Sequence, residues 1–142
     1  MSQPSVNALE GKVALIAGGA KNLGGLLARD LARHGVRGVA VHYNSDASRA
    51  TADDTVAAVR ALGADAQAWQ ADLTTAAAAA LLFDQAKARF GRLDIAVNTV
   101  GKVLKKPIAD ISEQEYDDMF AINSKAAFFF LKEAGRTLED HG

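Results

Sequence analysis

Short apolar runs alternate along the chain with longer segments in which apolar residues recur at helical spacing. The short runs predict strands, because they are brief, mostly apolar and followed by glycine or turn residues. They cover residues 12–18, 39–43, 65–70 and 93–101. The longer segments predict helices, which cover residues 23–34, 46–62, 76–90 and 113–138. The order is therefore strand then helix, four times over.

Start and stop signals agree with these helices. Gly35, Gly63 and Gly91 follow the first three, and glycine is the residue that most readily ends a helix. Side chains that can accept hydrogen bonds from free backbone amides stand at the starts of the second, third and fourth predicted helices. The expected caps are Ser45 or Asp46, Thr74 or Thr75, and Ser112 with Glu115 as a capping box.

The alternation predicts an α/β fold. A strand, a helix and a second strand form a right-handed crossover, which places the two strands parallel. Four such units predict a doubly wound parallel sheet with helices on both faces. No shift in composition marks a linker, so residues 1–142 are expected to form a single domain.

Composition narrows the classes of function. A net charge of -1 leaves no electrostatic footprint for nucleic acid or an anionic membrane. The absence of cysteine excludes disulfides, thiolate catalysis and cysteine-based zinc sites, and it favours a reducing, cytoplasmic location. The three histidines lack metal-ligand spacing, and the first residues lack the pattern of a signal peptide. We therefore expect no metal, nucleic acid or membrane as a partner.

The most informative motif is GGAKNLG, residues 18–24, between the first predicted strand and the first predicted helix. Here the backbone must turn tightly and approach a ligand closely, which glycine permits because it has no side chain. The amides at the helix N-terminus then point at the ligand, and the helix dipole favours an anion. The motif predicts a diphosphate-binding turn, with a ligand-free glycine turn as the alternative.

This turn resembles the T-G-x-x-x-G-x-G turn of the short-chain dehydrogenase/reductase family. Asp72-Leu73 is similar to the family's acidic contact to the adenine ring, and residues 98–101, Asn-Thr-Val-Gly, are similar to its N-N-A-G segment. Asn123 matches the asparagine of the family's Asn-Ser-Tyr-Lys catalytic set, where it helps to hold a water in the proton relay. Without the resemblance, Asn123 would be interpreted as a locally satisfied helix residue. The resemblance implies a Rossmann-like fold and a nicotinamide dinucleotide cofactor.

The chain departs from the family pattern at four positions near the turn. Ala17 replaces the threonine of the motif, which removes a hydroxyl tie, and Asn22 replaces its middle glycine. Asparagine is the next-best residue for a left-handed backbone, so the turn is expected to survive. Thr99 and Val100 replace Asn and Ala after the fourth predicted strand, and Val100 is bulkier beside the expected cofactor.

The choice of dinucleotide depends on the end of the second predicted strand. An NAD site places an acidic residue there to accept from the ribose 2′-hydroxyl, but residues 42–45 are His-Tyr-Asn-Ser. Lys21 could meet a 2′-phosphate, with Ser45 and Arg49 as further donors, or it could be a solvated surface residue. We predict NADP(H) rather than NAD(H). The expected cofactor-binding residues are Gly18, Lys21, Asn22, Leu23, Gly24, Tyr43, Asn44, Ser45, Asp72, Leu73, Asn98 and Gly101.

The resemblance implies a carbonyl–alcohol oxidoreductase in which a tyrosine moves the substrate proton and a lysine four residues later lowers its pKa. Neither Tyr43 nor Tyr116 is followed by a lysine at that spacing. The family's serine, tyrosine and lysine would follow Gly142, so the chain resembles the N-terminal, cofactor-binding part of such an enzyme. The alternatives are a non-catalytic nucleotide-binding module and a fragment.

Two further features permit two interpretations each. Lys102, Lys105 and Lys106 follow the fourth predicted strand, where they could attract an anion or form a solvated loop. The consecutive phenylalanines at 128–130 point about 100° apart around a helix, so one face cannot bury all three. They predict a homo-oligomer through this helix, as the resemblance also implies, or a core that uses two of them.

Overall fold

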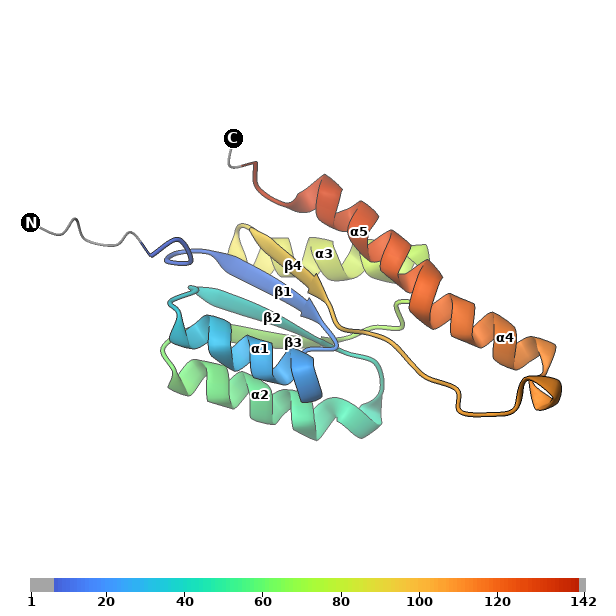
Figure 1. The fold of residues 1–142 in the computed structure, drawn as a ribbon. Helices are drawn as coiled ribbons and strands as arrows, with labels where there is room; N and C mark the ends of the chain where they lie inside the picture. Colours follow the sequence, from blue (N-terminus) through green and yellow to red (C-terminus); the bar gives the residue numbers. More distant parts are fainter. Residues whose placement is uncertain (1–6, 141–142) are drawn as a thin grey trace, which may run out of the picture.

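One parallel sheet with helices on both faces organises the computed structural model, which describes residues 7–140 (Figure 1). The strands lie in the order β3-β2-β1-β4 and all pairs are parallel. They are β1 (Val13–Ala17), β2 (Gly38–Tyr43), β3 (Asp65–Gln70) and β4 (Ile95–Asn98). The helices are α1 (Asn22–Arg33), α2 (Arg49–Ala61), α3 (Ala76–Phe90), α4 (Glu113–Phe120) and α5 (Ala126–Thr137). The predicted doubly wound α/β fold is confirmed.

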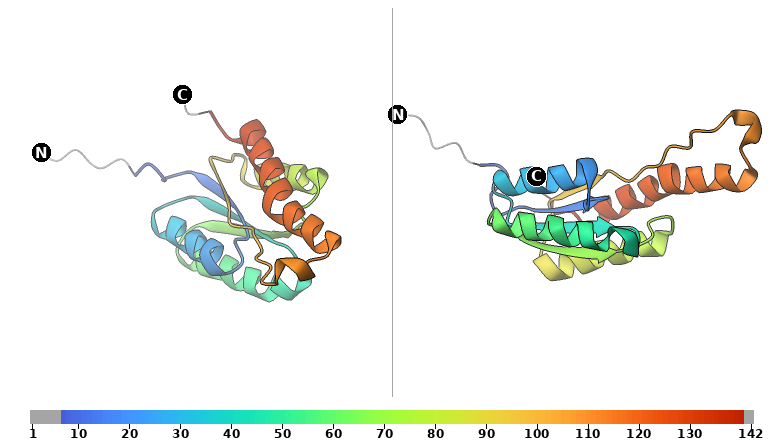
Figure 2. Two further views of the ribbon diagram at one scale, coloured as in Figure 1. Left: turned by 45° about the vertical axis from the view of Figure 1, so that its right-hand side comes forward. Right: turned by 90° about the horizontal axis from the view of Figure 1, so that it is seen from below.

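Helices cover both faces of the sheet, as is usual for a parallel sheet, and the central strands β1 and β2 are fully buried. Helices α1 and α2 cover one face, and α3 and α5 cover the other (Figures 1 and 2). Side chains alternate along a strand, so Leu15 of β1 packs with α3 and α5 while its neighbour Ile16 packs with α1 and α2. Both are fully buried. The two cores hold the strand ends, and hence the turns that follow them, at fixed positions.

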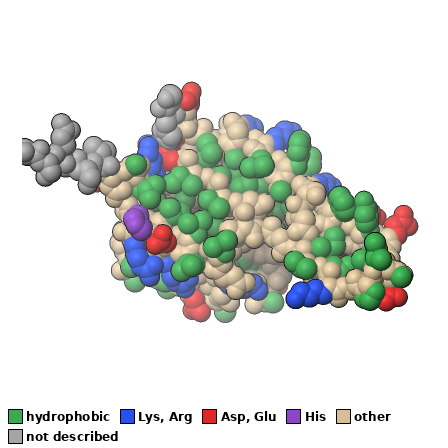
Figure 3. Space-filling model, viewed as in Figure 1, with side chains coloured by type: hydrophobic (Ala, Val, Ile, Leu, Met, Phe, Trp, Pro, Cys, Tyr) green, Lys and Arg blue, Asp and Glu red, His purple; other side chains and the backbone are tan. Residues whose placement is uncertain are grey.

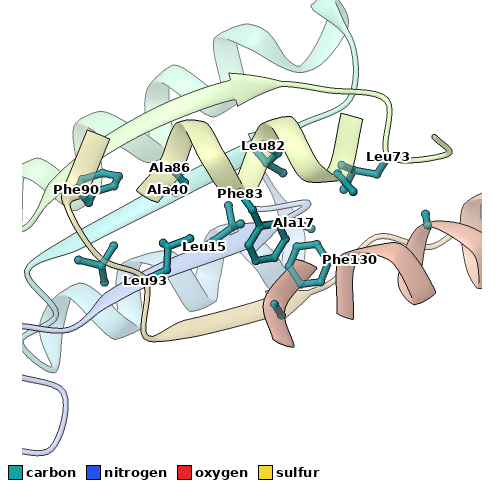
Figure 4. Packing of buried hydrophobic residues seen from close by; sticks show 14 residues of the cluster. Leu15, Ala17, Ala40, Leu73, Leu82, Phe83, Ala86, Phe90, Leu93 and Phe130 are labelled. Carbon is teal, nitrogen blue, oxygen red and sulfur yellow. The ribbon is translucent and has the colours of Figure 1, made fainter. Parts of the chain in front are cut away.

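The core beneath α3 and α5 is built around two phenylalanines. The rings of Phe83 and Phe130 meet edge to face with centroids 4.9 Å apart, and both side chains are 0% exposed (Figure 4). Phe129 packs partly against the same core, whereas Phe128 is 64% exposed. This core therefore uses two of the three consecutive phenylalanines, and the third points outward.

Helix α1 lies where the leucine spacing predicts it, but small residues form its buried side. Gly24, Gly25, Ala28 and Ala32 face the sheet, which lets the helix approach the strands closely. Leu27 and Leu31 pack only partly against the same core, and Leu23 and Leu26 are largely exposed. Leucine spacing thus predicted the helix but does not mark its buried face.

The expected caps are confirmed at two helices and wrong at one. The Thr75 hydroxyl accepts from the Ala78 amide at the start of α3, and Ser112 and Glu115 form the capping box of α4. At the second predicted helix, residues 46–48 form a 3₁₀ turn and α2 begins only at Arg49. Neither expected residue caps it, because the Ser45 side chain makes no capping bond and the Asp46 carboxylate pairs with Arg49 at 3.4 Å.

The last predicted helix is divided by one wide turn. Residues 121–125 are π-helical and join α4 to α5, which ends at Thr137. The Asn123 side chain donates to the carbonyl of Met119, four residues earlier, at 3.0 Å, and such insertions into the helix ladder accompany bends and π turns. Helix α4 and the loop before it extend away from the sheet (Figure 2). None of the helices in the described residues has the length and hydropathy of a bilayer-spanning segment.

Candidate functional site

A cleft of about 360 Å³ lies at the carboxyl ends of β1, β2 and β4. In open α/β sheets, ligands bind at this edge, where neighbouring strands feed helices on opposite faces. Here β1 leads to α1 on one side and β4 leads toward α5 on the other (Figure 1). The lining residues are Gly18, Ala20, Lys21, Asn22, Leu23, Gly24, His42, Tyr43, Asn44, Ser45, Ser48, Thr99, Val100 and Gly101.

The glycine turn forms one wall of the cleft, and its shape requires its small residues. Gly18 has a φ of +72°, and a Cβ built there would lie 2.6 Å from the Thr99 hydroxyl oxygen. A Cβ on Gly24 would overlap the Gly18 carbonyl oxygen. Asn22 has a φ of +52°, alone among the described residues other than glycine in having a positive φ. The expectation that asparagine would tolerate the left-handed backbone here is therefore confirmed.

Helix α1 presents its N-terminus to the same cleft. No side chain caps it, and no acidic residue lies in its first turn. The first amides of a helix have no partner within the helix, and together with the dipole they favour an anion. Because Asn22, Leu23 and Gly24 line the cleft, the N-terminus of α1 borders it, which suits an anion such as a diphosphate.

The second wall follows β2 and carries no acidic residue. Tyr43, Asn44 and Ser45 line it, and the exposed Lys21 stands at the same cleft. Arg49 lies nearby, with its guanidinium carbon 5.7 Å from the centre of the Tyr43 ring, and it also bonds to Gln70 at 3.3 Å. The cleft therefore offers hydroxyls from this wall and the Lys21 ammonium from the glycine turn, and its lining residues include no carboxylate.

Four predicted site residues lie outside the set that lines the cleft. Asp72 accepts hydrogen bonds from the amide and the hydroxyl of Thr74, at 3.0 and 2.7 Å. These bonds lower the pKa of the Asp72 carboxyl below its usual value, and the bond from the hydroxyl has the larger effect. Leu73 is only 3% exposed and belongs to the core. The Asn98 side chain accepts from the Val100 amide at 2.9 Å, so it shapes the turn after β4.

Asn123, the fourth of these residues, ties the π turn to the loop after β4. Its amide nitrogen donates to the Lys102 carbonyl and its oxygen accepts from the Lys102 amide, both at 2.9 Å. A Cβ on Gly101 would lie 3.2 Å from the same oxygen. Nearby, Lys106 pairs with Glu115 at 3.0 Å. The side chain of Asn123 thus fixes the approach of the helix to the cleft.

Two side chains at the base of the glycine turn, His42 and Thr99, were not among the site residues predicted from the sequence. His42 is 1% exposed, and its Nδ1 accepts from the Gly18 amide at 3.0 Å while its Nε2 lies 2.8 Å from the Ala71 carbonyl. Burial lowers the pKa of His42 below its usual 6.5, although the Ala71 carbonyl and Asp72 act to raise it. The Thr99 hydroxyl donates to the Ala17 carbonyl at 2.7 Å. A histidine inside an otherwise apolar strand was the available signal.

The family model for short chain dehydrogenases matches residues 12–142, which include every residue of the cleft. The chain belongs to the short-chain dehydrogenase family.

Individual members of the dehydrogenase family are similar over nearly the whole chain. A short chain dehydrogenase/reductase of Aspergillus novofumigatus, nsrJ, is 41% identical over 94% of this chain, and elsinochrome reductase 1 of Elsinoe fawcettii is 39% identical over 97%. A crystal structure from Burkholderia cenocepacia, described as a dehydrogenase with bound NADP, is 70% identical over 97% of this chain with a TM-score of 0.93. The chain covers 50%, 51% and 52% of these proteins, respectively, so it spans about half the length of the relatives it matches.

Proposed function

We propose that this chain binds NADP(H) in the cleft and forms the cofactor-binding part of an oxidoreductase that interconverts a carbonyl and an alcohol. The observation that carries the proposal is the turn from Gly18 to Gly24, where a Cβ at either glycine would collide with the turn or with Thr99. A turn with no room for side chains, at the mouth of an uncapped helix, suits a diphosphate. The NADP in the similar Burkholderia cenocepacia structure supports it.

The preference for NADP(H) over NAD(H) rests on the wall after β2. Residues 43–45 and Ser48 give this wall a phenol, an amide and hydroxyls, while Lys21 supplies a positive charge. A 2′-phosphate gains charge-assisted hydrogen bonds from such groups. A ribose 2′-hydroxyl finds no carboxylate among the lining residues, and a carboxylate is its usual partner.

A fluorescence titration tests binding and preference together, with Trp69, the chain's one tryptophan, as the reporter. NADPH is expected to bind about ten times more tightly than NADH or better. Lys21→Ala should reduce this preference by weakening NADPH alone, and Lys125→Ala, an exposed lysine outside the cleft, is the matched control. Equal dissociation constants for the two nucleotides would refute the preference, and binding of neither would refute the site.

The chemistry divides between this chain and the residues that family members place after it. A bound nicotinamide nucleotide donates or accepts the hydride. The glycine turn and the wall after β2 bind and orient the nucleotide, and Asn123 holds the loop at residues 101–102 against the π turn. Proton transfer to the substrate oxygen is the task of a Tyr-x-x-x-Lys pair, and residues 1–142 contain none.

The second candidate is a nucleotide-binding module without catalysis, which would apply if the whole polypeptide lacks this pair. The reading frame beyond codon 142 and the mass of the intact polypeptide separate the two. A serine followed about 13 residues later by Tyr-x-x-x-Lys, the family spacing, supports the enzyme. A frame that stops without this pair supports the module, and a polypeptide much heavier than 14.9 kDa identifies the chain as a fragment.

The proposal also includes a cytoplasmic location and a homo-oligomer that associates through the helix containing residues 128–130. The exposed Phe128 ring supports the second point, because large apolar side chains in a contiguous exposed patch mark interaction surfaces. Cell fractionation tests the first point, and light scattering tests the second. The substrate would be a small carbonyl or alcohol compound.

A further inference from the structure

We propose that His42 and Thr99 are positioning residues that clamp the peptide between Ala17 and Gly18 and thereby preform the nucleotide-binding turn. The inference rests on the proposed function, because it explains how this chain shapes the cleft for a dinucleotide. The clamp has one side chain on each flank of β1, from the two neighbouring strands β2 and β4.

On the β4 flank, Thr99 holds the carbonyl of this peptide. Its hydroxyl donates to the Ala17 carbonyl at 2.7 Å and its backbone amide donates to the same oxygen at 3.0 Å. The hydroxyl oxygen also lies under the turn, within 2.8 Å of where a Cβ on Gly24 would stand. The chain has lost the family's threonine at Ala17, and Thr99 supplies a hydroxyl to the same peptide from the neighbouring strand.

On the β2 flank, His42 holds the amide of this peptide and the amide that follows. The Gly18 amide donates to the His42 ring at Nδ1, and the Gly19 amide donates to the His42 carbonyl at 3.0 Å. Two successive amides of the turn are thus fixed by one residue. The residues that follow, from Ala20 to Gly24, line the cleft.

The other nitrogen of the His42 ring bonds to Ala71, the residue that follows β3. An amide can only donate and a carbonyl can only accept, so Nδ1 must be the acceptor and Nε2 must carry the proton donated to Ala71. The neutral Nε2–H tautomer satisfies both bonds, whereas a protonated ring would lose the bond to Gly18. Burial, which lowers the pKa of His42, keeps the ring in the neutral form.

A preformed turn matters because a loop that must be ordered by its ligand loses part of the binding energy. Gly18 has a left-handed φ, and its flanking glycine adds freedom. Without the clamp this segment would sample other conformations. The clamp therefore contributes to nucleotide affinity indirectly, because the donor and acceptor atoms of His42 and Thr99 bond to the protein backbone and not to the nucleotide.

Variants of His42 separate the two bonds of the ring. Asparagine keeps an acceptor near the position of Nδ1, and glutamine keeps a donor near the position of Nε2. In titrations of the 142-residue chain with NADPH, His42→Asn should stay within about threefold of the wild-type dissociation constant and His42→Gln should raise it about tenfold. His34→Gln, at an exposed histidine outside the cleft, is the control and should change nothing.

Thr99 provides an independent pair of variants. Thr99→Val removes the hydroxyl at nearly constant shape and should raise the dissociation constant about tenfold, while Thr99→Ser should restore it. Equal affinities for all four His42 and Thr99 variants would overturn the clamp. If wild type binds no nicotinamide nucleotide, the proposed function fails, and the clamp has no ligand to position.

Nuclear magnetic resonance tests the clamp in the unliganded chain, and amides in the middle of β2 serve as the control for changes in overall stability. The ring nitrogens of His42 should show the Nε2–H tautomer at neutral pH, and the Gly18 amide should exchange slowly although it lies in a turn. His42→Gln should accelerate exchange at Gly18 while amides in the middle of β2 keep their protection. An Nδ1–H tautomer, or rapid exchange at Gly18 in wild type, would overturn the inference.

Discussion

Gly24 leaves no room for a side chain, and this constraint gives a direct test of the turn. A Cβ there would overlap the Gly18 carbonyl oxygen, a backbone atom that cannot rotate away. Gly24→Ala should therefore displace the turn and raise the NADPH dissociation constant about tenfold or more. Fluorescence titration measures the change.

Gly135 is the matched control for this substitution. It lies in α5, and a Cβ built there meets nothing within 4 Å. Gly135→Ala should leave NADPH affinity unchanged and raise the free energy of unfolding by about 0.4–1 kcal/mol, because alanine has less conformational freedom to lose. Unchanged binding in Gly24→Ala would contradict the geometry of the turn.

His42 makes stability depend on pH in a defined direction. Its pKa is lower in the folded chain than its usual 6.5, so below about pH 6.5 the unfolded chain binds the proton more readily. The free energy of unfolding should therefore fall as pH drops below about 6.5, until the folded pKa is passed, at up to ~1.4 kcal/mol per pH unit. Urea unfolding at several pH values measures this slope.

His42→Gln is the comparison that assigns this slope. Glutamine does not titrate, so the variant should have a flatter dependence between about pH 5 and 6.5. The carboxyls with lowered pKa, such as Asp72 and Asp94, lose their stabilising ionised form at lower pH and are common to both proteins. Parallel curves for the two proteins would contradict a lowered pKa of His42 in the folded chain.

Single residues differ in how far the sequence predicts their role. The glycines and Asn22 were predictable, because their backbone preferences act locally and their order along the chain carries the signal. The bonds from His42 to Gly18 and from Thr99 to Ala17 join residues 24 and 82 positions apart. These bonds depend on which strands become neighbours and on the register between them, and the local sequence determines neither the strand order nor the register.

At the scale of elements, α5 offers a comparison between two phenylalanine positions that lie two residues apart. Phe130 is 0% exposed and meets Phe83, so Phe130→Ala should lower the free energy of unfolding by about 3–5 kcal/mol through lost burial and a cavity. Phe128 is mostly exposed, so Phe128→Ala should cost about 0.5 kcal/mol or less. Urea denaturation at one protein concentration measures both, and equal costs would contradict the packing of this helix.

The ranges of the helices and strands were predicted better than the faces that they bury. Strand and helix ranges follow from local periodicity and glycine stops, and Gly35, Gly63 and Gly91 all adopt the expected positive φ. The buried face of α1 did not follow, because glycine and alanine occupy its fully buried positions while two of its leucines are only partly buried and two are exposed. Packing distance is set by the partner element, which periodicity alone does not describe.

At the scale of the whole molecule, exposed apolar side chains gather on helices α4 and α5. Tyr116, Phe120, Phe128 and Leu131 are each more than half exposed and lie along α4 and α5. Figure 3 shows hydrophobic side chains at the end of the molecule that α4 occupies. An exposed apolar face of this kind favours association with another chain.

Self-association should therefore depend on this face and not on exposed apolar residues in general. Light scattering is expected to give a mass above 14.9 kDa that rises with concentration. Phe128→Ser should lower that mass, because it replaces an apolar contact with a hydroxyl that remains better solvated. Leu81→Ser is the matched control, since Leu81 is 57% exposed on α3, away from this face. A monomeric mass at every concentration, or an equal effect of both substitutions, would exclude association through the α4–α5 face.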